Sequence, residues 1–333
     1  MLIIGIETTT LAAHEQRWLQ HPVVAGVILF ARNIADRAQV GALVAQLREV
    51  REAPLLLCVD QEGGPVQRFR DGFGPLPALA RIGALWASEP ERACALARDH
   101  AWLMASQMRA LDIDLSFAPV LDLRCGNRAI GERAFDADPE ACAALAAAYI
   151  EGMHAAGMAA TGKHFPGHGS VLEDTHHDAA IDRRPWATLE ACDLVPFRAA
   201  VRAGVDAMMM AHVTYPQVDA LPAGYSERWI RHVLRDAMGF DGIVFSDDIA
   251  MVAAEGVGAV GQRVRQHLEA GCDVVLACQP GQVEAAIDAV PHDHVDETSE
   301  RLAALAGRPP ASGADALAAR HGEIVDALTA LSA

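Results

Sequence analysis

Short, almost uninterrupted apolar runs recur along the chain. Because successive side chains of a strand point to opposite faces, a run without polar positions indicates a strand that is buried on both faces, as in a parallel sheet. We therefore predict eight buried strands. They cover residues 2–6, 26–30, 55–59, 115–119, 158–162, 207–211, 243–245 and 273–277.

Longer stretches rich in Ala and Leu separate these runs, and their apolar positions recur at helical spacing. In residues 94–111 the apolar positions are three or four residues apart, which places them on one face of a helix. These positions are Cys94, Ala97, Ala101, Met104, Met108 and Leu111. The same reasoning predicts helices over residues 38–50, 140–156, 189–203, 229–238 and 260–270.

Eight predicted strands that alternate with helices are typical of a (β/α)₈ barrel, which usually takes about 250 residues. A doubly wound open sheet is the main alternative, but no Gly-x-Gly-x-x-Gly turn follows the first predicted strand. We expect residues 1–333 to form a single α/β barrel domain, with extra C-terminal helices over about residues 295–333. After Pro309 and Pro310, one such helix is indicated by Leu317, Ile324, Leu328 and Leu331.

The charge balance excludes a nucleic-acid partner. The chain has 27 Lys and Arg against 44 Asp and Glu, a net charge of −17, whereas nucleic-acid binding depends on basic residues that neutralise phosphates. The first residues lack the basic start of a signal peptide, and no apolar stretch approaches the roughly 18 residues of a membrane span. Seven cysteines without a Cys-x-x-Cys pair indicate a reducing compartment. We expect a cytoplasmic globular protein with no membrane partner.

Polar groups end four of the predicted strands. In a barrel, reactive side chains lie just beyond the carboxyl ends of the strands. A single polar residue there is ordinary loop onset, but four groups together indicate a site on one face of the barrel. The groups are residues 60–64 (Asp-Gln-Glu-Gly-Gly), 163–169 (Lys-His-Phe-Pro-Gly-His-Gly), His212, and 246–248 (Ser-Asp-Asp).

Residues 163–178 hold four of the fourteen histidines, and three interpretations are open. The first is a solvated loop. The second is a metal site, since His and Asp bind zinc, although Pro166 and Gly167 exclude the helical spacing of His-Glu-x-x-His sites. The third is acid/base chemistry, in which Asp174 orients His176 across a tight turn. An imidazole with a pKa of about 6.5 both gives and takes protons near neutral pH.

Asp247 and Asp248 directly follow the seventh predicted strand. Either carboxylate alone is most simply interpreted as the cap of the next helix. On a strand, however, the two side chains would point opposite ways. We therefore expect one to face the barrel mouth and the other to be held by surrounding donors. A carboxylate at the mouth, facing a histidine acid/base, is suited to nucleophilic attack.

The segment 163–169, followed by Asp174-x-His176, resembles the signature of family 3 glycoside hydrolases, specifically the bacterial β-N-acetylglucosaminidases of cell-wall recycling. Further segments agree with this family in order and spacing, and the similarity spans roughly residues 20–285. They are residues 60–64, 67–70 (Gln-Arg-Phe-Arg), 116–120 (Ser-Phe-Ala-Pro-Val), 130–133 (Ile-Gly-Glu-Arg), 211–213 (Ala-His-Val), 239–242 (Gly-Phe-Asp-Gly) and 245–248 (Phe-Ser-Asp-Asp).

Position by position, the resemblance implies that Asp247 is the nucleophile and that His176 is the general acid/base, assisted by Asp174. It implies no metal ion and no cofactor. His168, between two glycines, is expected to stabilise its loop, and His212 to line the site or support it. The resemblance also implies a set of residues that hold the sugar at the non-reducing end by donating and accepting hydrogen bonds. These are Asp60, Arg68, Arg133, Lys163 and His164.

The implied reaction is the removal of terminal β-linked N-acetylglucosamine from muropeptides, with retention, through a covalent glycosyl-enzyme. We also expect the loop over residues 167–185, which contains His176, to move and to close over bound sugar. Three alternatives remain open: a phosphorylase that uses the same site, a metal-dependent hydrolase built on the His and Asp cluster, and a sugar-binding protein without activity.

Overall fold

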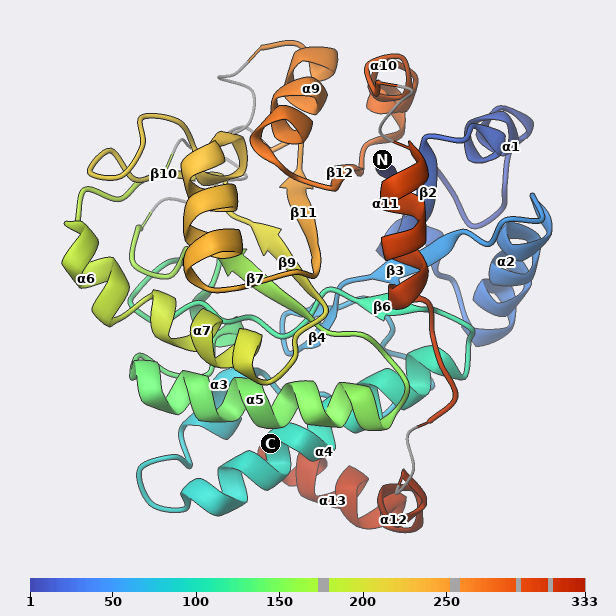
Figure 1. The fold of residues 1–333 in the computed structure, drawn as a ribbon. Coiled ribbons are helices and arrows are strands. Elements are labelled where there is room, and N and C mark those ends of the chain that lie inside the picture. Colours follow the sequence, from blue (N-terminus) through green and yellow to red (C-terminus); the bar gives the residue numbers. More distant parts are fainter. Residues whose placement is uncertain (173–179, 252–257, 292–294, 311–313, 333) are drawn as a thin grey trace.

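The computed structural model describes residues 1–332 except 173–179, 252–257, 292–294 and 311–313. Eight parallel strands form its centre (Figure 1). They are β1 (Leu2–Gly5), β2 (Val24–Leu29), β3 (Leu56–Val59), β6 (Leu115–Ser116), β7 (Thr161–Phe165), β9 (Ala207–Met210), β11 (Ile243–Asp248) and β12 (Val274–Ala277). Two small sheets lie beside them. They pair β4 (Gln61–Gly63) with β5 (Val66–Gln67), and β8 (Ala180–Ile181) with β10 (Val213–Thr214).

The eight strands follow one another around a ring in chain order. β1 pairs with both β2 and β12, so the first and last strands of the ring are neighbours. β6 and β7 complete the ring through parallel bridges from Leu115 to Ala159 and from Val120 to Lys163. The predicted (β/α)₈ barrel is therefore confirmed, and the open doubly wound sheet is excluded because the two ends of the sheet meet.

Helices form the connections between successive strands and surround the barrel (Figure 1). They are α1 (Ala13–Gln20), α2 (Arg37–Glu49), α3 (Leu79–Gly83), α4 (Pro90–Arg109), α5 (Pro139–Ala155), α6 (Trp186–Ala191), α7 (Leu194–Arg202), the π-helix η4 (Arg228–Ala237) and α9 (Val260–Ala270). Short 3₁₀ turns are η1 (Ala31–Asn33), η2 (Gly131–Arg133), η3 (Ala223–Tyr225) and η5 (Pro280–Gln282). After β12 follow α10 (Val283–Ile287), α11 (Val295–Leu302), η7 (Ala303–Leu305), α12 (Ala314–Ala319) and α13 (His321–Ser332).

The C-terminal helix α13 packs against α4, on the outer side of the helical layer (Figure 1). Ile324 and Leu328 are buried there, as their spacing predicts. The expected single helix is divided, however, into α12 and α13. Arg320 lies between the two helices, and its guanidinium is 3.3 Å from Asp99 of α4. Among the helices that the structure describes, none has both the length and the apolar character needed to cross a membrane.

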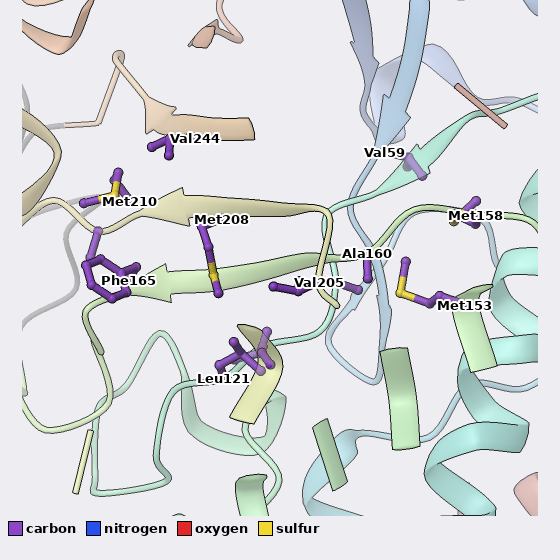
Figure 2. Packing of buried hydrophobic residues seen from close by; sticks show 14 of the residues in the cluster. Val59, Leu121, Met153, Met158, Ala160, Phe165, Val205, Met208, Met210 and Val244 are labelled. Atoms are coloured by element: carbon purple, nitrogen blue, oxygen red, sulfur yellow. The ribbon is translucent and has the colours of Figure 1, made fainter. Parts of the chain in front are cut away.

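Along each strand, residues that face the barrel interior alternate with residues that face the surrounding helices. On β9, Ala207 and Met209 belong to the interior cluster, whereas Met208 and Met210 face outward. Figure 2 shows these two outward methionines near Phe165 of β7, with Val244 of β11 on the far side of β9. Both faces of every strand are thus covered, which explains why the strands are continuous apolar runs.

Leu302 of α11 and Leu305 of η7 belong to the interior cluster of the barrel, together with Met1 and Ala25 at the starts of strands. Leu302 is 7% exposed and Leu305 is 1% exposed. The segment after β12 therefore closes the amino-terminal end of the barrel, and it leaves the carboxyl ends of the strands to form a site.

We expect Leu305→Ala to lower the free energy of unfolding by about 2–5 kcal/mol, because it removes buried methyl groups and leaves a cavity. Urea denaturation followed by circular dichroism measures this loss. Leu221→Ala is the matched control, since Leu221 is 48% exposed, and its effect should stay within about 0.5 kcal/mol. Equal effects of the two changes would contradict the role of Leu305 as a plug.

Strand β7 lies further along the chain than the apolar pattern predicts. The prediction was residues 158–162, whereas the strand covers Thr161–Phe165. Lys163 and His164 are therefore part of a buried strand and do not follow it. A charged strand residue is tolerated here because acidic partners lie within 3 Å of its ammonium group. In the same way β11 extends to Asp248, past the predicted end at residue 245.

The helix predicted over residues 189–203 is two helices, α6 and α7, which are separated at Cys192 and Asp193. Proline lacks the N–H that an internal helical position donates, so it is tolerated in a first turn. Pro196 falls in the first turn of α7 when the helix restarts at Leu194. The Asp193 side chain is bound by Arg184 at 2.8 Å. The break follows from both features.

Candidate active site

Inward-facing residues at the carboxyl ends of the strands line a cavity of about 250 Å³. Asp60 follows Cys58 by two positions, and Asp247 follows Phe245 by two, so the strand period continues the inward face into polar residues. The cavity contains every predicted site residue that the structure describes, namely Asp60, Arg68, Arg133, Lys163, His164 and Asp247. Its apolar walls are Ile28, Phe30, Val66, Phe117, Met209, Met251 and Leu276.

The hairpin β4–β5 directs Arg68 toward this cavity. The buried side-chain oxygen of Gln61 accepts hydrogen bonds from the backbone N–H of Arg68 at 2.8 Å and of Phe69 at 3.0 Å. Gly63 makes the turn with a φ of +100°, and a Cβ at this position would lie 2.8 Å from Nε2 of His100. The turn therefore requires glycine both for its backbone conformation and for space.

Four charged side chains form a continuous chain along one wall. Lys163 Nζ lies 2.8 Å from Asp60 Oδ1 and 2.6 Å from Glu62 Oε1. Arg133 donates two hydrogen bonds to the Glu62 carboxylate, both at 2.8 Å. The side chains of Lys163 and Glu62 are 2% and 1% exposed. Opposite charges thus alternate in a setting that excludes water, where a paired charge is stable and an unpaired one is costly.

Each buried charge holds its neighbour ionised. Burial raises the pKa of Glu62, but the charges of Arg133 and Lys163 outweigh it, so the pKa lies below its ordinary value. Burial lowers the pKa of Lys163, but Asp60 and Glu62 reverse this and leave it raised. The pKa of Arg133 is raised in the same way by Glu62, against the effect of burial. Glu62, Lys163 and Arg133 are therefore charged near neutral pH.

Arg68 keeps hydrogen-bonding capacity that the charged chain does not use. Its terminal nitrogen lies 3.6 Å from Asp60 Oδ2, and its guanidinium carbon is 5.8 Å from the centre of the Phe30 ring. Its Nε is buried and has no hydrogen-bond partner among the described residues. Because Arg68 lines the cavity, the terminal nitrogens of its guanidinium can donate hydrogen bonds to a ligand.

His164 is held by a buried carboxylate behind it. Its Nδ1 lies 2.7 Å from Asp122 Oδ2, and the other oxygen of Asp122 accepts the backbone N–H of His168 at 2.7 Å. Burial raises the pKa of Asp122, but the neighbouring His164 outweighs it and the pKa is lowered overall. His168 is buried, with Nδ1 3.1 Å from the Asn127 amide.

Asp247 and Asp248 both line the cavity, but their carboxylates are held differently. Asp247 Oδ1 accepts the backbone N–H of Asp248 at 2.8 Å. Asp248 Oδ1 accepts the N–H groups of Ala250 at 3.0 Å and of Cys278 at 3.3 Å, which join the end of β11 to the end of β12. Burial raises the pKa of the Asp248 carboxyl. Asp248 is therefore the acid that surrounding donors hold.

His212 lies behind the cavity wall and not in it. Its Nε2 is 3.1 Å from the carbonyl oxygen of Asp248, and its ring stacks on Tyr225. Burial lowers the pKa of His212. His212 was expected either to line the site or to support it, and this position fits the supporting role.

Asp174 and His176, the predicted acid/base pair, lie outside the described residues, as do His177 and Asp178. The metal-site hypothesis for this segment and the expected closure of the loop lie there as well. Within the described residues, Glu7, His14 and Glu15 are close enough together to share a metal ion. None of these three lines the cavity, and both Glu15 oxygens accept backbone N–H groups at 2.7 Å.

Sequence reasoning missed two acidic residues of the site, Glu62 and Asp122. Glu62 lies in the Asp-Gln-Glu-Gly-Gly segment, two positions from Asp60, and strand periodicity would have placed both on one face. Asp122 follows an apolar run and carries no such signal. Both act through partners that are distant in the chain, Arg133 for Glu62 and His164 for Asp122.

Comparison with known proteins gives the family. Residues 3–305 match the family model described as glycosyl hydrolase family 3 N terminal domain. A beta-hexosaminidase of Stenotrophomonas maltophilia (strain R551-3) is 58% identical over 325 residues, which cover 97% of this chain and 96% of the relative. A beta-hexosaminidase of Xylella fastidiosa (strain 9a5c) is 61% identical over 290 residues, 87% of each chain.

The fold has a similar counterpart among solved structures. NagZ from Neisseria gonorrhoeae, crystallised in complex with N-trifluoroacetyl-D-glucosamine, superposes with a TM-score of 0.91 at 38% identity. The match covers 100% of this chain and 98% of that one. The family model, the relatives and the solved structure all point to the same family. The chain therefore belongs to glycosyl hydrolase family 3, among the beta-hexosaminidases of that family.

Proposed function

We propose that this chain removes terminal, non-reducing β-linked N-acetylglucosamine from muropeptides by a retaining double displacement. The observation that carries the proposal is one shared cavity, in which the Asp247 carboxylate lies with the polar groups of Asp60, Lys163 and His164. The relatives' names support a hexosaminide substrate, and the complex of the gonococcal protein supports an N-acylated glucosamine in particular.

The sugar would be held by groups that match its hydroxyl and acetamide functions. Asp60 is a hydrogen-bond acceptor that shares Lys163 with Glu62. Arg68 has donors to spare, and His164 presents a ring edge. Arg133 donates two hydrogen bonds to Glu62 and one to the carbonyl oxygen of Ala129, so we assign it chiefly to fixing the wall of charged side chains. An alternating set of donors and acceptors suits a polyhydroxylated ring.

In the first step, the Asp247 carboxylate attacks the anomeric carbon, and His176 gives its proton to the departing oxygen. The C1–O bond to the leaving group breaks as the C1–O bond to Asp247 forms. In the second step His176 takes a proton from water, whose oxygen attacks the same carbon and releases Asp247. Two inversions leave the β configuration unchanged.

A histidine acid/base suits the charge of this cavity. Asp60, Glu62, Asp247 and Asp248 already place four acidic side chains around it. A fifth carboxylate as acid/base would be repelled by them, whereas an imidazole adds no negative charge in either protonation state. We assign Asp174 to orient His176 and to stabilise its imidazolium.

An aryl β-N-acetylglucosaminide, compared with the matching β-glucoside, tests the proposal. We expect turnover of the first only, at the same rate in phosphate-free buffer and with a chelator present. Loss of activity without phosphate would instead identify a phosphorylase, and loss with chelator a metal-dependent hydrolase. Absence of turnover under every condition would contradict an enzymatic role.

The natural substrate class needs a separate assay. A muropeptide with a terminal N-acetylglucosamine should release the free sugar, which chromatography detects. Turnover of the aryl substrate without release from the muropeptide would retain the hexosaminidase activity and reject this substrate class.

We also propose a cytoplasmic location. All seven cysteines are free thiols in the structure, which supports a reducing setting.

His176→Ala should lower kcat/KM by about 10²–10⁴-fold on a substrate with a poorly acidic leaving group. On a 2,4-dinitrophenyl glycoside, whose leaving group departs without a proton, the first step should change little. Values of kcat/KM for a series of aryl glycosides, whose leaving groups differ in acidity, measure the difference. A loss that is equal across the series would reject His176 as the general acid.

A further inference from the structure

The buried carboxylate of Asp122 does not line the cavity but contacts His164, which does, and the double-displacement chemistry does not use Asp122 directly. Asp122 is 1% exposed and His164 is 6% exposed. The Asp122 carboxylate contacts the His164 ring at 2.7 Å, the backbone N–H of His168 at 2.7 Å, and the backbone N–H of His164 at 3.3 Å. One carboxylate thus fixes both the ring and the backbone of this segment.

The partner of each ring nitrogen determines where a neutral imidazole carries its proton. An ionised carboxylate accepts hydrogen bonds and donates none. Both oxygens of Asp122 accept backbone N–H groups, that of His164 at 3.3 Å and that of His168 at 2.7 Å, which favours the ionised carboxylate. Nδ1 of His164, which faces that carboxylate, must therefore carry the proton. The Nε2 lone pair is then left for the cavity that His164 lines.

We propose that Asp122 is a positioning residue that keeps the proton of the neutral His164 ring on Nδ1, so that Nε2 accepts a hydrogen bond from a hydroxyl of the bound sugar. The substrate part of this inference rests on the proposed function, whereas the tautomer of the ring does not. A carboxylate that faces one ring nitrogen fixes the role of the other, as it does for histidines that bind metals.

Nitrogen-15 NMR of the free protein at pH 8 tests the tautomer, with the His164 signals assigned by their loss in His164→Gln. In the wild-type protein we expect a protonated Nδ1 and an unprotonated Nε2. In Asp122→Asn the amide can donate to Nδ1 while its oxygen still accepts from His168, so the proton should move to Nε2. A wild-type ring protonated on Nε2 would overturn the proposal, whether or not the variant folds.

Asp206→Asn is the matched control. Asp206 has the same arrangement at the other end of the barrel, since one carboxylate oxygen lies 2.7 Å from His154 Nε2 and accepts the backbone N–H of Ala160 at 2.8 Å. No residue of this group lines the cavity. The His164 signals should be the same in this variant as in the wild-type protein.

Calorimetry with N-acetylglucosamine separates positioning from general damage. Asp122→Asn should weaken binding by up to about tenfold, the worth of one good hydrogen bond. In a His164→Gln background it should add less than about twofold, because a residue that acts through His164 has nothing left to position. The same loss in both backgrounds would overturn the proposal. Absence of binding by the wild-type protein would count against the proposed function and leave the tautomer result standing.

Discussion

Asp247→Asn is expected to lower kcat by on the order of 10⁴-fold or more on an aryl β-N-acetylglucosaminide, because an amide oxygen is too weak a nucleophile to attack an anomeric carbon. The change is nearly isosteric. The amide oxygen can still accept the N–H of Asp248, as the carboxylate does at 2.8 Å. Unfolding by urea should therefore be nearly unchanged, and the loss should appear in the rate.

Asp248→Asn is the neighbouring control. Its oxygen can keep the bonds from Ala250 and Cys278, so we expect a loss of no more than about tenfold. Intact-mass measurement after rapid quenching of a 2,4-dinitrophenyl donor adds a direct readout. The wild-type protein should gain the mass of one N-acetylglucosaminyl unit and Asp247→Asn should not. Equal losses in both variants, or a labelled Asp247→Asn, would reject Asp247 as the nucleophile.

Glu62→Gln is expected to lower the free energy of unfolding by about 3–5 kcal/mol, because it leaves two buried cations with a neutral neighbour. Glu62 is bound by Arg133 through two bonds of 2.8 Å and by Lys163 at 2.6 Å. Asp60 remains a partner for Lys163, so Arg133 loses the most. Because the same side chains form a wall of the cavity, binding of N-acetylglucosamine should weaken as well.

The control for this change is Glu151→Gln. Glu151 lies 2.7 Å from Arg98, but its side chain is 60% exposed and that of Arg98 is 41% exposed. Solvent screens such a pair, and its removal should cost about 0.2–1 kcal/mol. Urea denaturation of the two variants under one set of conditions compares them. If Glu62→Gln were no less stable than Glu151→Gln, the charged wall would not hold the site together.

The charges of the cavity compensate one another. The cavity is lined by four acidic side chains, and each of them is met by a cation or a backbone donor. Lys163 neutralises Asp60 and Glu62 together, and Arg133 neutralises Glu62 a second time. These cations thus compensate much of the negative charge that the acidic side chains bring to the cavity.

Most of the site was predictable from the sequence because it lies close to strand ends. The apolar runs indicated the number and order of the eight strands, and the period of two places Asp60 and Asp247 on the inward face. The motif resemblance added residues that strands do not carry, such as Arg133 on η2, which lines the same cavity. Roles in catalysis remain predictions for the experiments above.

The position of β7 was not predictable from apolar pattern. A lysine and a histidine normally mark the end of a buried strand, and here they are inside one. Their burial depends on Asp60, Glu62 and Asp122, which lie 42 to 103 positions before the residues that they contact. A local pattern contains no information about such partners, so the strand was placed three residues early.

The sequence by itself determined the barrel, its strand order and the face on which chemistry gathers, because hydrophobic periodicity and chain order are local properties. Only the tertiary structure decided which charges neutralise each other. It joined Glu62 to Arg133 and Asp122 to His164 between neighbouring parts of the ring. It also decided that Asp248 is the held acid of the pair, since its donors come from the neighbouring strand. These outcomes depend on the energy of burying a charge, which is set by what surrounds it and not by its neighbours in sequence.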